Sequence, residues 1–324
     1  MRRIGIIGLG TVFEQHLRAL ALLKDTFRLL AVCDVDPGRL APALTRCEAL
    51  LGPEDVIATA DLDAFLRLDL DAVVIATPPQ SHYGLADACL RVQKNVLVEK
   101  PAVTDIQQLL TLYAMARKRG CLLQVAYHAA FGAEVLWFWD HREALERQFG
   151  ARKLEQIVCC FSDPYVREGN LLPGSEVLGG SYLDSTVNEL SVCARLANLS
   201  DFRIVRFESV PLRADNPVIV QSLLQLQEVA GQTVISCHTD WTQGINHKES
   251  LLRYDNGTTV LLDHSEQTVT VNGTDICYDN GAEPRLVSQY GKLYRDYARQ
   301  LDAASCNEPF SILLHQLLLE PLRS

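Results

Sequence analysis

Residues 4–13 read IGIIGLGTVF, an apolar run that ends in two glycines and opens a helical pattern. A dinucleotide-binding fingerprint occupies this position, because the backbone N–H groups at the start of the helix then face a pyrophosphate. Gly8, Gly10, Thr11 and Val12 are the predicted contacts. Phe13 stands where the fingerprint has its third glycine, so the segment alone also fits a plain glycine turn.

Asp34 strengthens the fingerprint. It ends the second apolar run, about 20 residues further on, where an acidic side chain accepts hydrogen bonds from the adenosine ribose hydroxyls. A carboxylate there would repel a 2′-phosphate, which favours NAD over NADP, although nearby Arg39 could moderate this preference. The alternative is a solvated loop acid.

The first 126 residues alternate short apolar runs with longer helical patterns, which indicates βαβ units and a parallel sheet. Strands are expected at 4–7, 29–33, 72–76, 96–98 and 122–125, with a weaker one between 53 and 60. Helices are expected at 14–24, 37–51, 82–93 and 105–119. We therefore predict an α/β N-terminal Rossmann domain, a doubly wound parallel sheet that binds a dinucleotide, over residues 1–126.

The pattern changes at residue 127. Helical stretches near 134–148 and 182–199 precede β-rich runs from 202 to 271, and helical pattern resumes at 288–301 and after Pro309. The pairs Asn256-Gly257 and Asn272-Gly273 predict hairpins with type I′ turns, which need a positive φ at both central residues. We predict a C-terminal α+β domain with a mostly antiparallel open sheet over 127–324, for substrate binding and oligomerisation.

The bulk composition excludes several classes of protein. With 48% hydrophobic and 22% charged residues, the 324-residue chain resembles ordinary folded protein and is long enough for two domains. A net charge of -10 would repel a phosphate backbone, so no nucleic-acid partner is expected. The N-terminus is too short and glycine-rich for a signal peptide, and no apolar run approaches the roughly 18 residues that span a bilayer. We expect a cytoplasmic protein with no membrane partner.

No metal site is predicted. The 10 cysteines are scattered without a zinc-like spacing and are expected to be buried thiols in a reducing compartment. His238, His247 and His264 also lack the spacing of metal ligands, so they are expected to be structural or to line a pocket.

Residues 76–82 read ATPPQSH and, after a helical pattern, residues 96–101 read VLVEKP. Together with the fingerprint, they resemble the Gfo/Idh/MocA oxidoreductase family, also called the glucose-fructose oxidoreductase and inositol dehydrogenase family. The resemblance covers nearly all of residues 1–126 and continues more faintly over 179–184. It implies that Thr77, Pro78, His82, Glu99 and Lys100 contact the cofactor and that a cis peptide bond precedes Pro101.

Lys100 carries the chemistry that the resemblance implies. In the family, the matching lysine lies at the domain junction beside the nicotinamide and hydrogen-bonds the reacting oxygen. Hydride transfer at a carbon requires proton transfer at its oxygen, and an ammonium both donates a hydrogen bond and stabilises developing alkoxide charge. The alternative for Lys100 is a surface ammonium on a loop.

The family completes its site with an Asp and a His four residues later on one helix face. The matching residues here are Asp184 and Asn188. The spacing places both side chains on one face, but an amide has no titratable nitrogen and cannot act as a general base near neutral pH. Asn188 therefore departs from the family at a catalytic position.

Three hypotheses address this departure. Lys100, with a pKa lowered by burial, exchanges the proton itself; or Tyr182, Tyr127 or His128 replaces the imidazole; or catalysis is lost. We favour the first two together. Residues 127–131 also lack the Asn or Arg that the family tends to carry, so Tyr127 and His128 are expected to shape a different substrate pocket.

Together these residues predict an NAD(P)-dependent oxidoreductase that transfers a hydride between nicotinamide and a secondary alcohol or ketone of a sugar, sugar derivative or cyclitol. NAD is the expected cofactor, with NADP as the alternative. An enzyme that retains NAD and acts by transient oxidation, as in glycoside cleavage, is one competing hypothesis, and a non-catalytic dinucleotide-binding regulatory protein is another. Relatives suggest a homodimer or homotetramer by analogy.

Overall fold

The computed structural model describes residues 1–53, 55–281 and 283–323, and the chain divides into two compact units. The first unit combines Met1–Ala126 with Tyr290–His315, and the second combines Tyr127–Gln289 with the residues after His315. The chain returns to the first unit near its end, whereas the sequence predicted one continuous second domain from residue 127.

Helix α8 (Arg285–Ala303) explains this return. Its residues Tyr290, Tyr294 and Tyr297 are fully buried, and spacings of four and three residues place them on one helix face. The rings of Tyr294 and Tyr297 lie 5.8 and 6.3 Å from the ring of Phe27, which belongs to the first unit. This aromatic face therefore completes the core of the first unit.

The first unit contains a six-stranded sheet in the order β3-β2-β1-β4-β5-β6, and every neighbouring pair is parallel. The strands are β1 (Arg2–Ile7), β2 (Phe27–Cys33), β3 (Ile57–Thr59), β4 (Ala72–Ile75), β5 (Asn95–Glu99) and β6 (Leu123–Ala126). The α-helices of its N-terminal segment are α1 (Phe13–Ala21), α2 (Leu40–Leu51), α3 (Leu62–Leu66), α4 (Pro79–Arg91) and α5 (Ile106–Arg119), with the short 3₁₀ helix η1 (Pro37–Arg39). The predicted doubly wound Rossmann sheet is confirmed, including the weak strand expected between 53 and 60.

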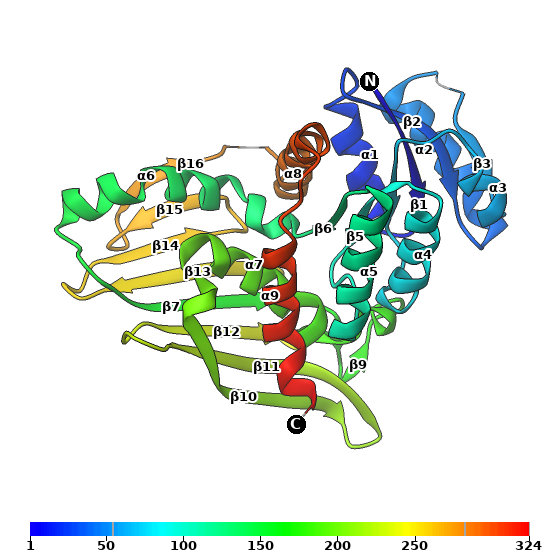
Figure 1. Cartoon of the computed structure of the whole chain (residues 1–324). Coiled ribbons are helices and arrows are strands. Elements are labelled where there is room, and N and C mark those ends of the chain that lie inside the picture. Colours follow the sequence, from blue (N-terminus) through cyan, green and yellow to red (C-terminus); the bar gives the residue numbers. More distant parts are fainter. Residues whose placement is uncertain (54, 282, 324) are drawn as a thin grey trace. The chain divides into compact units, whose positions relative to one another are not determined.

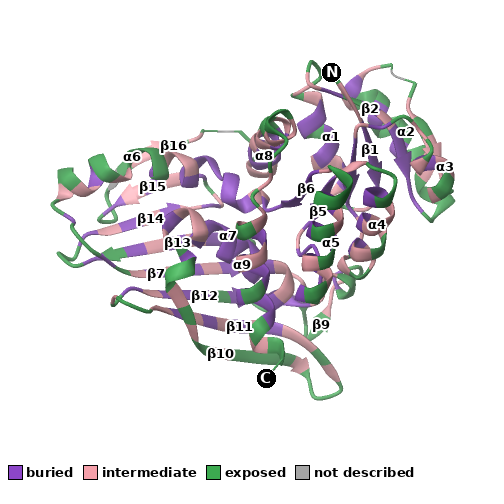
Figure 2. Ribbon diagram, in the orientation of Figure 1, coloured by how far each residue is buried: buried purple, intermediate pink, exposed green. Residues whose placement is uncertain are grey.

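The strands of this sheet are apolar because helices cover both faces. Every residue of β4 and β6 is buried, and β6 is drawn purple in Figure 2. The chain leaves β1 toward β2 on one side, and β4 pairs on the other, so the strand order reverses at β1 and β4. Ligands of such sheets bind outside the carboxyl ends of the strands at this reversal.

The second unit is built on an eight-stranded open sheet in the order β10-β11-β12-β7-β13-β14-β15-β16 (Figure 1). The strands are β7 (Leu154–Ser162), β10 (Phe202–Arg213), β11 (Asn216–Glu228), β12 (Val234–Asp240), β13 (His247–Tyr254), β14 (Thr259–Asp263), β15 (Thr268–Val271) and β16 (Asp275–Asp279). Only the pairing of β12 with β7 is parallel within this sheet. The predicted mostly antiparallel sheet is therefore confirmed.

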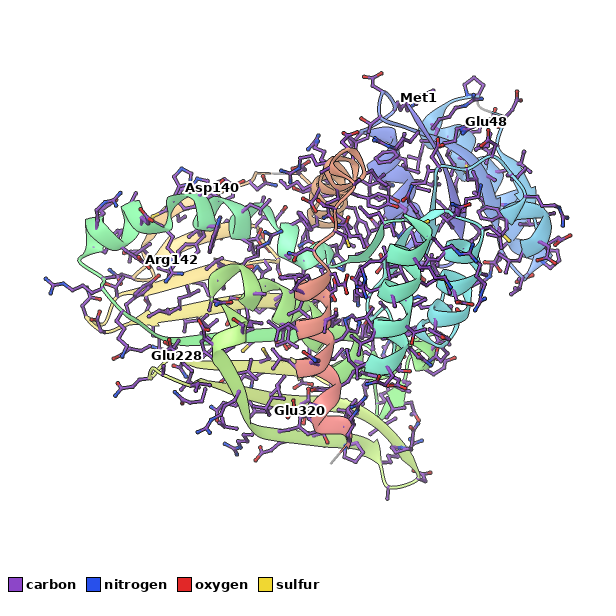
Figure 3. The ribbon with its side chains drawn as sticks, in the orientation of Figure 1. Met1, Glu48, Asp140, Arg142, Glu228 and Glu320 are labelled. Carbon is purple, nitrogen blue, oxygen red and sulfur yellow. The ribbon has the colours of Figure 1, made fainter. Side chains whose placement is uncertain are left out.

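Helices cover one face of this sheet. Helix α6 (Ala133–Phe149) packs on β14, β15 and β16, while α7 (Val187–Leu196) packs on β7 and β12 (Figure 1). Residues along β11 and β13 alternate between buried and half-exposed, as expected when one face of a strand is covered. Arg142 of α6, labelled in Figure 3, donates to the carbonyl of Leu196 at 2.8 Å and so ties α6 to the end of α7.

Shorter elements connect these parts. They are the ribbon β8 (Val166–Arg167) and β9 (Asn170–Leu171), the 3₁₀ helices η2 (His128–Phe131), η3 (Glu176–Leu178) and η5 (Leu199–Asp201), the π-helical turn η4 (Tyr182–Thr186), and, at the end of the chain, α9 (Glu308–Leu319) and η6 (Glu320–Arg323). The helix predicted at 182–199 is thus a π turn followed by the shorter α7. No helix in the described ranges has the length and apolarity needed to cross a bilayer.

Both predicted hairpins form, but with different turns. Asn272 and Gly273, between β15 and β16, have φ values of 52° and 74°, as the predicted type I′ turn requires. Between β13 and β14, only Gly257 has a positive φ, of 81°, so the type I′ prediction for Asn256-Gly257 is wrong. There the Asn256 side chain accepts from the Thr258 N–H at 3.0 Å and donates to the Phe149 carbonyl at 2.9 Å, which favours a negative φ.

Candidate functional site

The predicted cofactor residues of the first unit all follow the carboxyl ends of neighbouring strands. Gly8 follows β1, Asp34 follows β2, Thr77 lies just after β4, and Lys100 follows β5. Since these strands are parallel, their carboxyl ends lie at one edge of the sheet. The structure therefore brings these four positions to the edge where a dinucleotide binds in this fold.

Gly8 occupies a position that only glycine fits. Its φ is +97°, and a Cβ on it would lie 2.5 Å from the carbonyl oxygen of Ala76. The turn after β1 therefore runs directly against the turn after β4. The space around Gly10 is open. A Cβ placed on Gly10 would have one described neighbour within 4 Å, the Arg39 guanidinium at 3.7 Å.

The first turn of α1 provides donors for an anion. Val12 precedes this helix without a side-chain capping hydrogen bond, and Thr11 is exposed. Such a helix start leaves backbone N–H groups directed outward and a positive dipole end. Phe13 is fully buried, so the residue that replaces the third glycine belongs to the core. The space over Gly10 and these donors fit a pyrophosphate.

Asp34 connects the fingerprint to the end of β2. Its Oδ2 accepts from the Leu9 N–H at 2.8 Å, and its Oδ1 accepts from the Asp36 N–H at 2.9 Å. Each carboxylate oxygen retains a second lone pair with which to accept from a ribose hydroxyl. Arg39 Nη1 lies 3.8 Å from Asp34 Oδ2, so a half-exposed cation stands next to the acid. The acid is consistent with NAD, and the cation is the group that a 2′-phosphate would need.

His82 holds two loops of this edge together. One ring nitrogen lies 2.7 Å from the carbonyl oxygen of Thr77, and the other lies 2.9 Å from that of Pro101. The ring is fully buried, and burial lowers the pKa of His82. Its place inside the unit indicates that His82 positions the loops that carry Thr77 and Lys100, while Pro78 is exposed at the start of α4.

Glu99 fixes the backbone of Lys100. The carboxylate is buried, accepts from the Tyr290 hydroxyl at 2.6 Å through Oε1, and accepts from the Lys100 N–H at 3.1 Å through Oε2. His16 Nε2 lies 3.2 Å from the same Oε1, and His16 Nδ1 lies 2.9 Å from the Tyr294 hydroxyl. Lys100-Pro101 is a cis peptide bond, as the resemblance implied.

His315 fixes the next part of this loop. Its Nε2 accepts from the Ala102 N–H at 3.0 Å, which requires the proton to be on Nδ1, 3.0 Å from the Ser311 carbonyl. Burial lowers the pKa of His315 to about 4. Sequence reasoning missed Tyr290, Tyr294 and His315. The buried helical spacing of the tyrosines was the one signal that they belong to a core.

In the second unit, Tyr182, Asp184 and Asn188 lie on the π turn and α7. Gly180, just before the turn, has a φ of +93°, and a Cβ there would lie 2.6 Å from the Ile219 carbonyl oxygen. Asn188 donates through Nδ2 to the Asp184 carbonyl at 3.3 Å. π turns inside helices are frequent at functional sites because they displace side chains from the regular helical positions.

Tyr182 and Tyr127, two of the candidates to replace the missing imidazole, are both buried in the second unit. Tyr182 is fully buried with its ring 4.7 Å from that of Phe207, and its hydroxyl has no hydrogen-bond partner among the described residues. Burial raises the pKa of Tyr182, which makes it a poor proton donor or acceptor near neutral pH. Tyr127 is also buried and immediately precedes η2. Neither tyrosine lines the pocket described next, which favours packing roles for both.

The second unit contains a pocket, here called the second-unit pocket, of about 280 Å³ including space open to solvent. Its lining combines polar and charged side chains with apolar ones, and most of the surface that faces the pocket is apolar. The lining residues are His128, Ala129, Phe161, Asn188, Val192, Lys248, His264, Arg285 and Gln289. Of the predicted site residues, His128 and Asn188 therefore meet in one pocket. Lys248, Arg285 and Gln289 are pocket residues that the sequence did not indicate.

Hydrogen bonds orient both histidines of the pocket. His128 Nδ1 lies 2.9 Å from the Gln289 Oε1, an acceptor, so Nδ1 carries the proton and Nε2 carries the lone pair. His264 Nδ1 lies 2.7 Å from Glu134 Oε1, and its Nε2 lies 2.7 Å from the Ser250 hydroxyl. Both nitrogens of His264 are thus engaged in the core. Within the described residues, no group of three or more His, Cys, Asp or Glu could hold a metal ion.

Comparison with known proteins agrees with this geometry. Residues 2–127 match the model GFO_IDH_MocA, an oxidoreductase family with an NAD-binding Rossmann fold. Inositol 2-dehydrogenase 1 of Saccharopolyspora erythraea is 34% identical over 146 residues, which are 44% of this chain and 41% of that protein. The matched segment thus spans less than half the length of this curated relative.

Two solved structures extend the likeness to the whole fold. The 3-ketoreductase KijD10 of Actinomadura kijaniata, solved with NADP and TDP-benzene, has a TM-score of 0.81 at 20% identity, covering 99% of this chain and 97% of that one. UDP-N-acetylglucosamine 3-dehydrogenase GnnA of Acidithiobacillus ferrooxidans has a TM-score of 0.77 at 18% identity, covering 99% and 96%. At these identities the likeness shows the fold alone. Residues 2–127, with their fingerprint and their Glu99-Lys100-Pro101 segment, therefore match the NAD-binding Rossmann domain of the Gfo/Idh/MocA oxidoreductase family.

Proposed function

We propose that this chain is an NAD(P)-dependent oxidoreductase that transfers a hydride between nicotinamide and a secondary alcohol or ketone of a sugar, sugar derivative or cyclitol. The carrying observation is the fixed Glu99-Lys100 segment at the same sheet edge as the fingerprint. A buried carboxylate that holds the backbone of a lysine prepares that lysine for a defined position.

The first unit would hold the dinucleotide mainly through its backbone. The N–H groups around Gly10, Thr11 and Val12 would donate to the pyrophosphate, and Asp34 would accept from the adenosine ribose. When bound, the nicotinamide supplies the hydride donor or acceptor. Thr77 and Pro78, held by His82, would form the wall of this site at the end of β4.

Lys100 would donate a hydrogen bond to the oxygen of the reacting carbon. An ammonium at that oxygen stabilises the negative charge that grows as the alcohol loses its proton or as the ketone accepts a hydride. Glu99 keeps the backbone of this residue in place, while the Tyr290 hydroxyl keeps Glu99 in place. These residues are therefore positioning residues for Lys100.

His128 is our candidate for the imidazole that Asn188 does not provide. Gln289 fixes its tautomer, so Nε2 has the lone pair that a general base needs. His128 lies in the pocket that Asn188 also lines. Asp184 and Asn188 would orient hydroxyl groups of the substrate, and Tyr182 would support the π turn from beneath.

The names of relatives support the substrate class. One curated relative is an inositol 2-dehydrogenase, and the two solved structures are a 3-ketoreductase and a nucleotide-sugar 3-dehydrogenase. The three names describe dehydrogenation of a cyclitol, reduction of a ketone and dehydrogenation of a nucleotide sugar. This agreement favours an alcohol or ketone on a ring as the substrate. Assays with a panel of polyols and ketosugars would identify the ring.

A Lys100→Met variant tests the proposal. We expect kcat/KM on the best polyol or ketosugar to fall by about 10³-fold or more, with NADH affinity within about threefold of wild type, because the ammonium acts on the reacting oxygen. Lys118→Met, on the exposed side of α5, is the matched control and should behave like wild type.

The competing functions give other results. Wild-type protein that binds NADH tightly but turns over no polyol or ketosugar would favour the non-catalytic regulatory protein, to which Asn188 in place of a base already points. Turnover of a glycoside without net change in the dinucleotide would favour transient oxidation. Full activity in Lys100→Met would contradict the role given to Lys100.

A further inference from the structure

Arg285 is a cation of the second-unit pocket on which Asp163, Glu134 and Asp263 act only through their longer-range charge. It is the first residue of α8, it is half-buried, and it lines the pocket. Among the side chains that the structure describes, none forms a hydrogen bond or an ion pair with its guanidinium. Buried guanidinium groups normally have such partners, because taking a charge out of water costs free energy.

The position of Arg285 is unfavourable for the helix as well. The N-terminus of a helix carries a positive partial charge that favours acidic residues, yet the first turn of α8 contains none and begins with this arginine. Burial also lowers the pKa of Arg285. A cation at this place is therefore explained poorly by folding and well by an anionic ligand.

The acids around the pocket are already engaged. Asp163 accepts from Lys248 Nζ at 2.5 Å, and the same ammonium donates to Asn246 Oδ1 at 2.9 Å. Glu134 is bonded to His264 at 2.7 Å. No Asp or Glu is among the lining residues of this pocket. Arg285 is thus the cation of the lining that is left to receive an anion.

Asn188 adds a second requirement. It is 6% exposed, its Nδ2 donates to the Asp184 carbonyl, and its Oδ1 has no hydrogen-bond partner among the described residues. A buried acceptor without a donor costs about 1–3 kcal/mol, and a ligand hydroxyl can supply that donor. A small molecule that carries both an anionic group and a hydroxyl would therefore match Arg285 and Asn188. Phe161 and Val192 provide an apolar wall for the C–H faces of that molecule.

We propose that the second-unit pocket binds the carboxylate of an acidic sugar or polyol, such as a hexuronate, with Arg285 as the residue that selects it. The planar guanidinium pairs with a carboxylate through two parallel hydrogen bonds. Asn188 Oδ1 accepts from a neighbouring hydroxyl of the same molecule. This inference rests on the proposed function, since it names the substrate class of the proposed oxidoreductase.

Matched pairs of sugars test the charge requirement. We would measure the affinity of the full chain with NADH for D-glucuronate against D-glucose and for D-galacturonate against D-galactose, with glucose 6-phosphate as a different anion. In at least one pair, the acid should bind roughly tenfold tighter or more than the neutral sugar, because charge-assisted hydrogen bonds contribute about 1.5–3 kcal/mol.

Variants show whether Arg285 causes the preference. Arg285→Gln should lose the advantage of the acid, and Arg285→Lys should retain part of it, whereas Arg253→Gln, on the exposed side of β13, should keep it. Arg285→Gln should be at least as stable as wild type in urea, since it removes a half-buried charge to which no described residue is hydrogen-bonded. If Arg285 had a structural role, its replacement would instead lower the free energy of unfolding.

Several results would overturn the inference. Equal or weaker binding of both acids, a preference that survives Arg285→Gln, or tighter binding of the phosphate ester than of either uronate would each do so. Turnover of neutral polyols with unchanged kinetics in Arg285→Gln would reject the acidic substrate and leave the proposed oxidoreductase standing. Failure to bind NADH would instead reject the oxidoreductase.

Discussion

The sheet edge of the first unit and the second-unit pocket are made of different chemical groups. At the sheet edge, the predicted ligand groups are backbone N–H donors around Gly10, and the acids Asp34 and Glu99 are tied to backbone N–H groups. At the pocket, side chains are oriented by hydrogen bonds to other side chains. Examples are His128 with Gln289 and Lys248 with Asp163. Ligand binding at the sheet edge therefore depends on the backbone conformation, whereas ligand binding in the second-unit pocket depends on the identity of single side chains.

This difference separates binding from selectivity. A site made of backbone groups recognises what all dinucleotides share, since its donors do not change with the side chains around them. A pocket made of ionisable side chains in a partly dry environment discriminates strongly, because each unmatched group costs free energy. Replacements in the two regions should therefore fail in different assays.

Replacing His128 should have the largest effect and should appear only in turnover. We expect His128→Asn to lower kcat by about 10²- to 10⁴-fold, which is the usual contribution of a general base, with NADH affinity unchanged. Steady-state kinetics and calorimetry on the same preparation measure both quantities. His141→Asn, exposed on α6, is the control. Wild-type turnover in His128→Asn would remove proton transfer from this residue.

Gly8→Ala should have the next largest effect, and it should weaken binding and stability together. Its Cβ would meet the Ala76 carbonyl at 2.5 Å in a left-handed conformation, so we expect a loss of about 2–4 kcal/mol in the free energy of unfolding. Affinity for NADH should fall at least tenfold.

Gly84 of α4 provides the matched control. No atom lies within 4 Å of a Cβ placed on it. Gly84→Ala should therefore stabilise the protein by about 0.5–1 kcal/mol, as an exposed helical glycine does when replaced by alanine. Equal behaviour of the two variants would show that the turn after β1 tolerates a side chain and is not a close backbone contact.

Lowering the pH should reduce the free energy of unfolding through His315, which holds the loop after Lys100. The pKa of buried His315 lies at about 4 in the folded chain and near 6.5 when unfolded, so the unfolded chain binds the extra proton between these values. The contribution of this residue to stability is complete above pH 6.5 and falls by about 3 kcal/mol as the pH drops to 4.

Urea unfolding at a series of pH values measures this dependence. His315→Gln should flatten the curve between pH 6.5 and 4 relative to wild type, while His141→Gln should not. A wild-type curve that His315→Gln leaves unaltered would mean that this imidazole is protonated in the folded state.

Removing one hydroxyl beneath Glu99 should have the smallest effect. Tyr290→Phe takes a 2.6 Å donor from a buried carboxylate, so the free energy of unfolding should fall by about 1–2 kcal/mol. Tyr83→Phe on α4 is the control. A Tyr290→Phe chain as stable as wild type would show that Glu99 is held without the Tyr290 hydroxyl.

The sequence predicted the sheet edge well because its signals are local. Gly8, Asp34 and Lys100 each follow an apolar strand pattern within a few residues, and parallel strands bring such positions together. The cis bond before Pro101 followed from the resemblance. Tyr290 and His315 escaped notice because no local pattern says that the last helices return to the first unit.

The pocket could be predicted only in part. His128 and Asn188 stood out against the family pattern, but Lys248, Arg285 and Gln289 come from a strand and a helix far away in sequence. Their convergence depends on the pairing of β7 with β13 and on where α8 begins. Tyr182 has the residue type of a proton donor, and its burial against Phe207, which favours a packing role, could not be read from the sequence.

Titration calorimetry of the full chain with NADH tests whether the first unit binds a dinucleotide, which every proposed catalytic role requires. We predict saturable binding of one NADH per chain that Gly8→Ala weakens and Gly84→Ala does not. Absence of binding by the folded wild-type chain at millimolar NADH and NADPH, or equal binding by Gly8→Ala, would contradict it.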